Sequence, residues 1–286
     1  MAQPSYNIEK VYKEISTIDG YFGEKADKSE FINGSISKYC PYRARPQSYL
    51  CYDYLERASS GVIYLLKSLE KYGLEYDKLA EYAILFLSYK LKQHSHHKST
   101  KLNEFYNKHI GDKHFKEKIK DSNSMTYKDI IDKKKDLMNM NINEISKFNE
   151  AFSILCKLYN EIKNNKLDCK NYSKCPERFA NKFKELNNDS NINGNTSYSK
   201  LLYTLSDDYN NLKNKYDNNN SCNFPSLPKI KTPPSKLIPV LSTFSVIPVF
   251  LGIAYKYSLF GVDKLFQRQY LRKKLKKIKK SMKLNL

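Results

Sequence analysis

Apolar residues recur at helical spacing along most of the chain before residue 217. Within 46–72 one stripe repeats at i, i+3, i+4 and i+7 and comprises Val62, Leu65, Leu66 and Leu69. This pattern predicts an amphipathic helix, with Gly73 as its stop. Residues 77–93 are apolar on nearly every side, which predicts a buried central helix. The polar run HSHHKST at 94–100 follows as a predicted loop.

Three further segments have the same helical period. Residues 141–163 keep an apolar face, and Asn141 with Glu144 forms a candidate capping pair at its start. Pro176 marks the start of a helix that continues through the stripe Phe179, Phe183 and Leu186. A last stripe runs from Leu201 to Tyr216. Because no segment alternates with period two for long enough to demand a strand, the predicted fold class is all-α.

The longest uncharged run is LIPVLSTFSVIPVFLGIAY, residues 237–255. Nineteen residues at about 1.5 Å each extend about 28 Å, close to the roughly 30 Å hydrocarbon core of a bilayer. Pro239 and Pro248 would break a soluble core helix but are tolerated in a membrane helix. The sequence therefore predicts one C-terminal transmembrane helix.

A basic tail follows this predicted span. Residues 256–286 hold 11 Lys or Arg and a single acid, Asp263, which places half of the net charge of +20 in the last 31 residues. The positive-inside rule puts this tail in the cytosol and the preceding domain outside. The apolar residues Leu271, Leu275, Ile278 and Met282 recur at spacings of four, three and four, which predicts an amphipathic helix on anionic lipid. The predicted lipid-facing residues are Leu271, Arg272, Lys273, Lys274, Leu275, Lys276, Lys277, Ile278, Lys279 and Lys280.

The predicted organisation has four parts. A helical ectodomain covers 1–216, and a Pro- and Asn-rich stalk without periodicity covers 217–236. The transmembrane helix covers 237–255 and the cytosolic tail 256–286. The N-terminus reaches Glu9 and Lys10 without an apolar segment, so no cleavable signal is expected. A tail-anchored protein with a cytosolic domain is the competing topology.

Six cysteines precede the predicted span, and an even count on the outer side suits disulfides. The candidates are Cys40, Cys51, Cys156, Cys169, Cys175 and Cys222. A local Cys40–Cys51 bridge fits the Pro-containing loop between them, whereas Cys156 lies in a helical run and is a candidate for a buried free thiol. Six cysteines allow 15 pairings, so the connectivity stays open. Zinc is disfavoured because no C-x-x-C pair occurs.

The other polar clusters do not indicate a catalytic or metal site. His94, His96 and His97 lie in the predicted loop with no acidic or cysteine partner nearby, which favours a solvated loop over a metal site. The run DKKKD at 132–136 is interpreted as a solvated helix face. Phosphate-binding, zinc-protease and nucleophile-elbow motifs do not occur, so neither an enzyme nor a cofactor is predicted. The basic charge lies beside the span, which disfavours a nucleic-acid partner.

Several stretches together resemble the Plasmodium interspersed repeat (PIR) variant proteins of malaria parasites, in the rodent-parasite branch. They are YKDIIDKKKDLMNMNINEISKFNEAF at 127–152, INGNTSYSKLLYTLSDDYNNLKNK at 192–215, KLIPVLSTFSVIPVFLGIAYKYSLFG at 236–261 and QYLRKKLKKIKKSM at 269–282. Cysteines 40, 51, 156 and 169 also lie where the family tends to place them. Cys175 and Cys222 are additional to that pattern.

The resemblance implies an exported, single-pass membrane protein of the infected red cell with a helical outer domain. It implies a role in antigenic variation and in binding host cells or serum factors, without catalysis and without active-site residues. The expected partners are the lipid bilayer, anionic lipid head groups at the tail, and an unidentified host-cell or serum protein. An intracellular trafficking or membrane-remodelling scaffold, with a cytosolic domain and reduced cysteines, is the alternative function.

Overall fold

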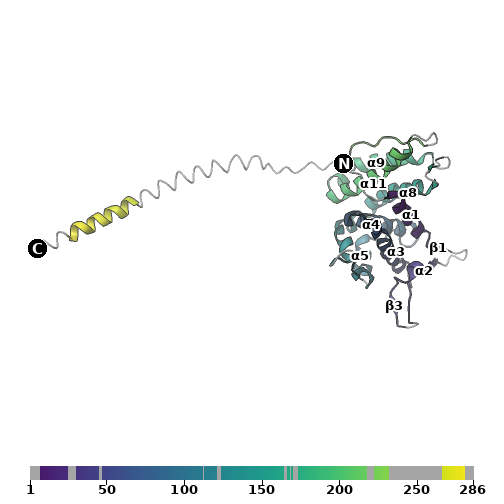
Figure 1. The fold of residues 1–286 in the computed structure, drawn as a ribbon, viewed down its shortest axis with the longest axis horizontal. Coiled ribbons are helices and arrows are strands. Elements are labelled where there is room, and N and C mark those ends of the chain that lie inside the picture. Colours follow the sequence, from purple (N-terminus) through teal and green to yellow (C-terminus); the bar gives the residue numbers. More distant parts are fainter. Residues whose placement is uncertain are drawn as a thin grey trace. The chain divides into compact units, whose positions relative to one another are not determined.

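A computed structural model describes residues 7–24, 30–44, 47–111, 113–120, 124–163, 166–167, 169, 173–217, 222–231 and 266–280. The chain divides into two units, Met1–Pro233 and Pro234–Leu286. The first is a mostly helical domain, and the second contains the helix at 266–280 (Figure 1).

The domain is built mainly from helices of very different length. The helices are α1 (Ile8–Asp19), α2 (Gly34–Ser37), α3 (Tyr54–Glu70), α4 (Tyr76–Gln93), α5 (Leu102–His109), a 3₁₀ turn (His114–Lys116), α6 (Tyr127–Asp132), α7 (Lys135–Met138), α8 (Ile142–Asn160), α9 (Cys175–Asn188), α10 (Ser190–Asn193) and α11 (Thr196–Tyr216). The short strands are β1 (Phe22–Glu24), β2 (Glu30–Ile32), β3 (Tyr42–Arg43), β4 (Ser48–Tyr49), β5 (Ile162–Lys163) and β6 (Lys166–Leu167).

Helix α4 forms the centre of the domain, as its apolar composition predicts. It packs against α3, α6 and α8, and nearly every residue from Leu79 to Ser88 is buried. A helix that is apolar on all sides is stable only when neighbours surround it. Helix α3 is also buried on several sides in its middle, where every residue from Ala58 to Ile63 is buried.

Two glycines shape α3. Gly73 has φ +66° and lies beyond the helix end, so the predicted stop is confirmed. Gly61 lies in the helix interior, where a Cβ atom would come within 2.5 Å of the Phe22 ring. This close approach allows the β1 strand to pack on α3. The helix begins at Tyr54, so residues 47–53 of the predicted segment at 46–72 are not helical.

The predicted helix starts at Asn141 and Pro176 are confirmed. Asn141 and Glu144 form a capping box at α8, in which the Asn141 side chain accepts from the Glu144 amide and Glu144 Oε2 accepts from the Asn141 amide at 3.2 Å. Pro176 occupies the first turn of α9, where its missing N–H costs nothing. Local chemistry thus fixes where α8 and α9 begin.

The all-α prediction is wrong in one respect. Among the described residues, three antiparallel hairpins pair β1 with β2, β3 with β4, and β5 with β6. Each strand has only two or three residues, too few for an alternating pattern to appear in the sequence. Each hairpin lies between two helices along the chain, and the core of the domain is formed mainly by the helices.

Part of the predicted stalk packs on the helical domain. Cys222 and Phe224 are buried, and the Asn187 side chain donates to Lys229 O and accepts from the Lys231 amide, at 2.9 and 2.8 Å. Prolines without periodicity suggest a free linker, but long-range contacts hold residues 222–231 against α9 and α11. These residues therefore belong to the domain, whereas the sequence assigned them to the stalk.

The predicted span, 237–255, lies outside the described residues. Within the part of the chain that the structure describes, no helix combines the length and the hydropathy that a bilayer crossing requires. Residues 266–280 form a helix with every side chain exposed, including Leu271, Leu275 and Ile278. Met282, the last apolar residue of the predicted tail stripe, lies outside the described residues.

Candidate functional site

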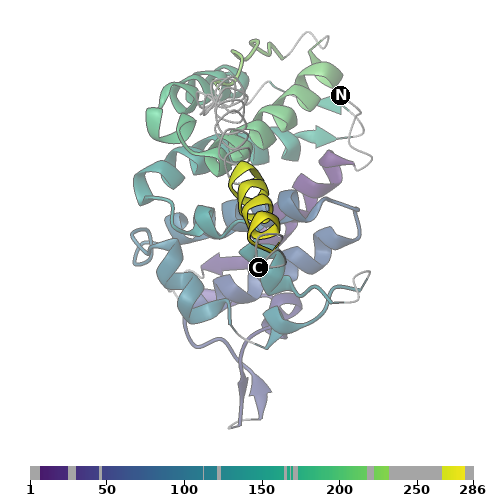
Figure 2. The same ribbon diagram turned by 90° about the vertical axis from the view of Figure 1, so that its left-hand side faces the viewer.

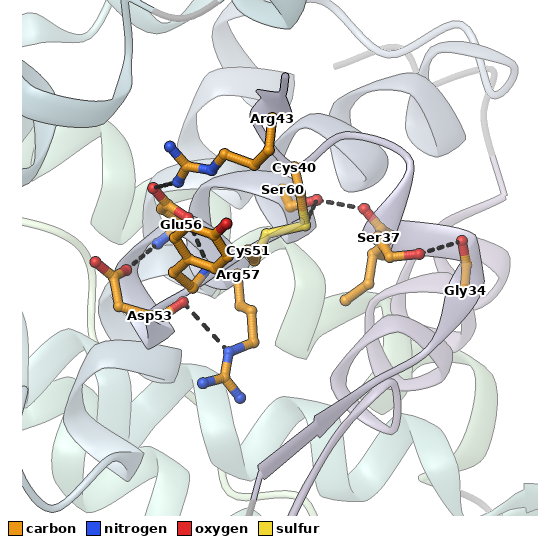
Figure 3. Close-up of a disulfide and its surroundings, with 11 residues drawn as sticks. Gly34, Ser37, Cys40, Arg43, Cys51, Asp53, Glu56, Arg57 and Ser60 are labelled. Atoms are coloured by element: carbon orange, nitrogen blue, oxygen red, sulfur yellow. Dashed lines mark hydrogen bonds and ion pairs between the residues drawn. A yellow bond between two sulfur atoms is a disulfide. The ribbon is translucent and has the colours of Figure 1, made fainter. Parts of the chain in front are cut away.

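A disulfide between Cys40 and Cys51 closes the base of the β3–β4 hairpin (Figure 3). We call the described residues 40–44 and 47–52 the stapled finger. In Figure 2 the hairpin extends beyond the helices at one end of the domain. The bridge crosses 11 positions, and a loop of that length gains about 3 kcal/mol from a disulfide in the chain-entropy model.

An arginine clamp fixes the finger to α3. The Arg43 guanidinium binds Glu56 and lies 4.4 Å from the centroid of the Tyr52 ring. Glu56 Oε2 also accepts the Tyr52 amide at 2.7 Å, while Asp53 caps α3 by accepting the Glu56 amide (Figure 3). The hydrogen bond to Glu56 raises the pKa of Arg43 above its ordinary value. The finger is therefore held at both its disulfide and its charged contact.

The finger exposes aromatic side chains. Tyr42 and Tyr52 are 57% and 64% exposed, and Tyr49 and Leu50 are also exposed. Tyr42 and Tyr49 face each other across the strands, edge to face, with centroids 5.4 Å apart. Sequence reasoning did not single out these residues. The signal was present, however, since three tyrosines lie within eleven residues between and beside two close cysteines.

A buried histidine supports the finger at its base. His114 contacts the Tyr49 ring at 5.8 Å and the Tyr39 ring at 5.3 Å, and its Nδ1 lies 2.6 Å from Glu117. Burial opposes ionisation of Glu117, but hydrogen bonds with Lys67 and His114 lower its pKa overall. The result is a fixed polar cluster that supports the aromatic side chains beside the disulfide.

The six cysteines divide into two disulfides and two thiols. Cys169 bridges to Cys222, which connects the segment after β6 to the segment after α11. Cys156 and Cys175 are buried free thiols, so they are not disulfide residues as the sequence analysis had offered. Burial raises the pKa of both thiols, which suppresses thiolate chemistry. Cys156 lies in α8, the environment that the sequence indicated for a free thiol.

Two buried polar clusters join the helices. Asp208 of α11 accepts from the hydroxyls of Tyr12 in α1 and Tyr82 in α4, each at 2.8 Å. Lys134, just before α7, binds Glu81 at 2.7 Å and Asp77 at 3.0 Å. The solvated-face interpretation of 132–136 is thus wrong for Lys134, because tertiary packing brings α4 carboxylates onto it.

The histidines of the loop at 94–100 pack against an aromatic ring. His94 and His97 stack on the Tyr54 ring with centroids 4.0 and 5.7 Å away, so they are half-buried and not fully solvated. In the described residues no group of three or more His, Cys, Asp or Glu is placed to hold a metal ion. The loop therefore packs against α3 through its rings.

Two comparisons with known proteins point to the same family. The family model of the Plasmodium variant antigen protein Cir/Yir/Bir matches residues 12–256. A solved Plasmodium PIR protein ectodomain is similar to the chain, with 33% sequence identity and a TM-score of 0.58. The match covers 78% of this chain and 100% of that ectodomain. A search of curated proteins found no match.

Proposed function

This chain belongs to the Plasmodium variant antigen family Cir/Yir/Bir, a non-enzymatic family, and on that premise we propose that it is a single-pass membrane surface antigen and adhesin. Its role is antigenic variation together with binding of a host-cell or serum protein. The likeness to the solved PIR ectodomain is the observation that carries this proposal, because it spans the whole of that ectodomain.

The disulfides support an outward-facing domain. Disulfides persist in oxidising compartments and are rare in cytosol, where thiols are kept reduced. Both bridges lie before residue 237, on the side of the proposed span that the positive-inside rule places outside. The proposed topology therefore has the helical domain outside, residues 237–255 in the bilayer and the basic tail in the cytosol of the infected cell or parasite.

Protease protection on intact infected cells tests this topology. With one epitope tag before Met1 and a second after Leu286, external protease is expected to remove the first tag and spare the second until lysis. Maleimide added after denaturation should label two thiols per chain without reductant, and six after reduction.

The opposite pattern would contradict the proposal. Protection of both tags in intact cells, with six reactive thiols before reduction, would place the domain in cytosol. The trafficking or membrane-remodelling scaffold would then replace the adhesin.

The tail helix is proposed to lie on anionic lipid. Leu271, Leu275 and Ile278 recur at spacings of four and three on the exposed helix at 266–280, and lysines surround them. Each basic residue near an anionic surface contributes about 1 kcal/mol. The apolar stripe adds its own burial at the interface.

Substitution K276Q with K277Q in a peptide of residues 256–286 is expected to weaken binding to phosphatidylserine vesicles about 30-fold, or about 2 kcal/mol. Co-sedimentation with vesicles measures the loss, and the substitution N285Q serves as an uncharged control. Wild-type binding that is insensitive to phosphatidylserine content would contradict the proposal.

A further inference from the structure

Exposed apolar side chains of the domain gather on the stapled finger. Among the described residues up to 231, the large hydrophobic side chains that are exposed are Tyr42, Tyr49, Leu50, Tyr52 and Tyr203. Four of these five lie within an eleven-residue stretch of the finger. Soluble domains seldom concentrate exposed apolar surface in this way unless a partner covers it.

These side chains contribute little to the core, because more than half of Tyr42 and of Tyr52 faces solvent. The disulfide and the Arg43–Glu56 contact nevertheless hold the backbone that carries them. Gln47, in the turn of the hairpin, has φ +59°, a left-handed conformation that a tight turn requires. A rigid support for exposed rings lowers the ordering cost of binding, which raises affinity.

The ring geometry favours a protein partner over a sugar. Tyr42 and Tyr49 occupy each other's surface edge to face, and the Arg43 guanidinium covers one face of Tyr52. The finger therefore offers ring edges and an aliphatic Leu50 instead of a series of open ring faces. Such a surface fits apolar pockets, and Tyr and Arg are the residues enriched at the energetic centres of protein interfaces.

The charges near the finger select an acidic partner. The two acids that follow it, Asp53 and Glu56, are engaged in the α3 cap and in the Arg43 contact. Lys38, which precedes the finger, is exposed over the Tyr39 and Tyr64 rings. A second copy of the domain would bring its own excess of basic over acidic residues, 39 against 29 in residues 1–255, which disfavours self-association.

We infer that the stapled finger is the docking surface for a folded host protein that offers apolar pockets bordered by carboxylates. This inference rests on the proposed binding function and names the surface and the partner class for it. Tyr42 and Tyr52 fill the pockets, and the exposed Lys38 faces the carboxylates.

The test uses the full-length chain, purified with its disulfides intact, on an array of purified host cell-surface and serum proteins that also includes the chain itself. Substitution Y42S with Y52S is expected to weaken binding to the host protein about 30-fold. The matched control Y203S removes an exposed tyrosine of α11, outside the finger, and is expected to leave binding unchanged. Thermal unfolding of all three proteins should coincide, because the substituted side chains are exposed.

The outcomes separate this inference from the proposed function. If a host protein binds wild type and Y42S/Y52S equally, the finger is not the docking surface. The proposed adhesin function would still stand. Failure of every host protein to bind would overturn both. Binding only to the chain itself, binding abolished by deglycosylating the partner, or binding insensitive to salt would overturn the acidic-protein assignment.

Discussion

Replacing Asp208 by asparagine is expected to remove a pH dependence of about 4 kcal/mol from the free energy of unfolding. Burial raises the pKa of the Asp208 carboxyl to about 7, despite the hydrogen bonds from Tyr12 and Tyr82 that favour its ionised form. An unfolded aspartate has a pKa of about 3.9. Between these two values the folded state holds a proton that the unfolded state has lost.

The sign follows from this difference in proton binding. The contribution of Asp208 to stability is greatest below about pH 4 and falls as pH rises towards 7. The substituted asparagine carries no charge, yet its amide can still bond both tyrosine hydroxyls, since a hydroxyl can turn to donate or accept. The variant is therefore expected to gain stability over wild type as pH rises through this window.

Urea unfolding at pH 4.5, 6 and 8 measures the effect for both proteins. Comparing variants is necessary because other carboxyls, including Asp129 and Asp189, have lowered pKa values and give the opposite slope. The control E104Q changes an exposed carboxylate that is not among the groups acting on Asp208, and it should keep the wild-type slope. Parallel pH profiles for D208N and wild type would show that Asp208 titrates normally.

Replacing Glu81 by glutamine is expected to destabilise the domain by about 3 kcal/mol and to lower Tm by roughly 6–12 °C. The Lys134 and Glu81 side chains are only 4% and 3% exposed, and Glu81 also accepts from Thr204 at 2.6 Å. Burial lowers the pKa of Lys134, but the hydrogen bonds to Glu81 and Asp77 raise it overall. Glutamine keeps the shape and leaves a buried ammonium with a single carboxylate partner.

The control for this prediction is the exposed pair Lys101–Glu104, at 3.6 Å. Substitution E104Q is expected to cost less than about 0.5 kcal/mol because water screens that pair. Adding K134M to E81Q should recover part of the loss by removing the unpaired charge. If E81Q and wild type unfolded at the same temperature, the buried ion pair would contribute nothing to stability.

The helices could be predicted where their signals are local. The stripes of α3, α8 and α11 follow a period of 3.6 residues, and the Asn141–Glu144 cap and Pro176 depend on neighbours within one turn. The boundary of α3 was less predictable, since Ser48 and Tyr49 form a hairpin strand and Cys51 a disulfide just before the helix. Strands of two residues leave no period to detect.

The sequence by itself determined that this chain forms a helical domain with a basic tail, and its motifs identified the family. Tertiary structure decided which cysteines pair, why Lys134 is buried and Asp208 joins α1, α4 and α11, and where the exposed tyrosines gather. The physical reason is range: helix period and caps depend on residues within four positions. Disulfide partners, buried charges and surface clusters depend on residues brought together by packing, such as Tyr12 and Asp208, which are 196 positions apart.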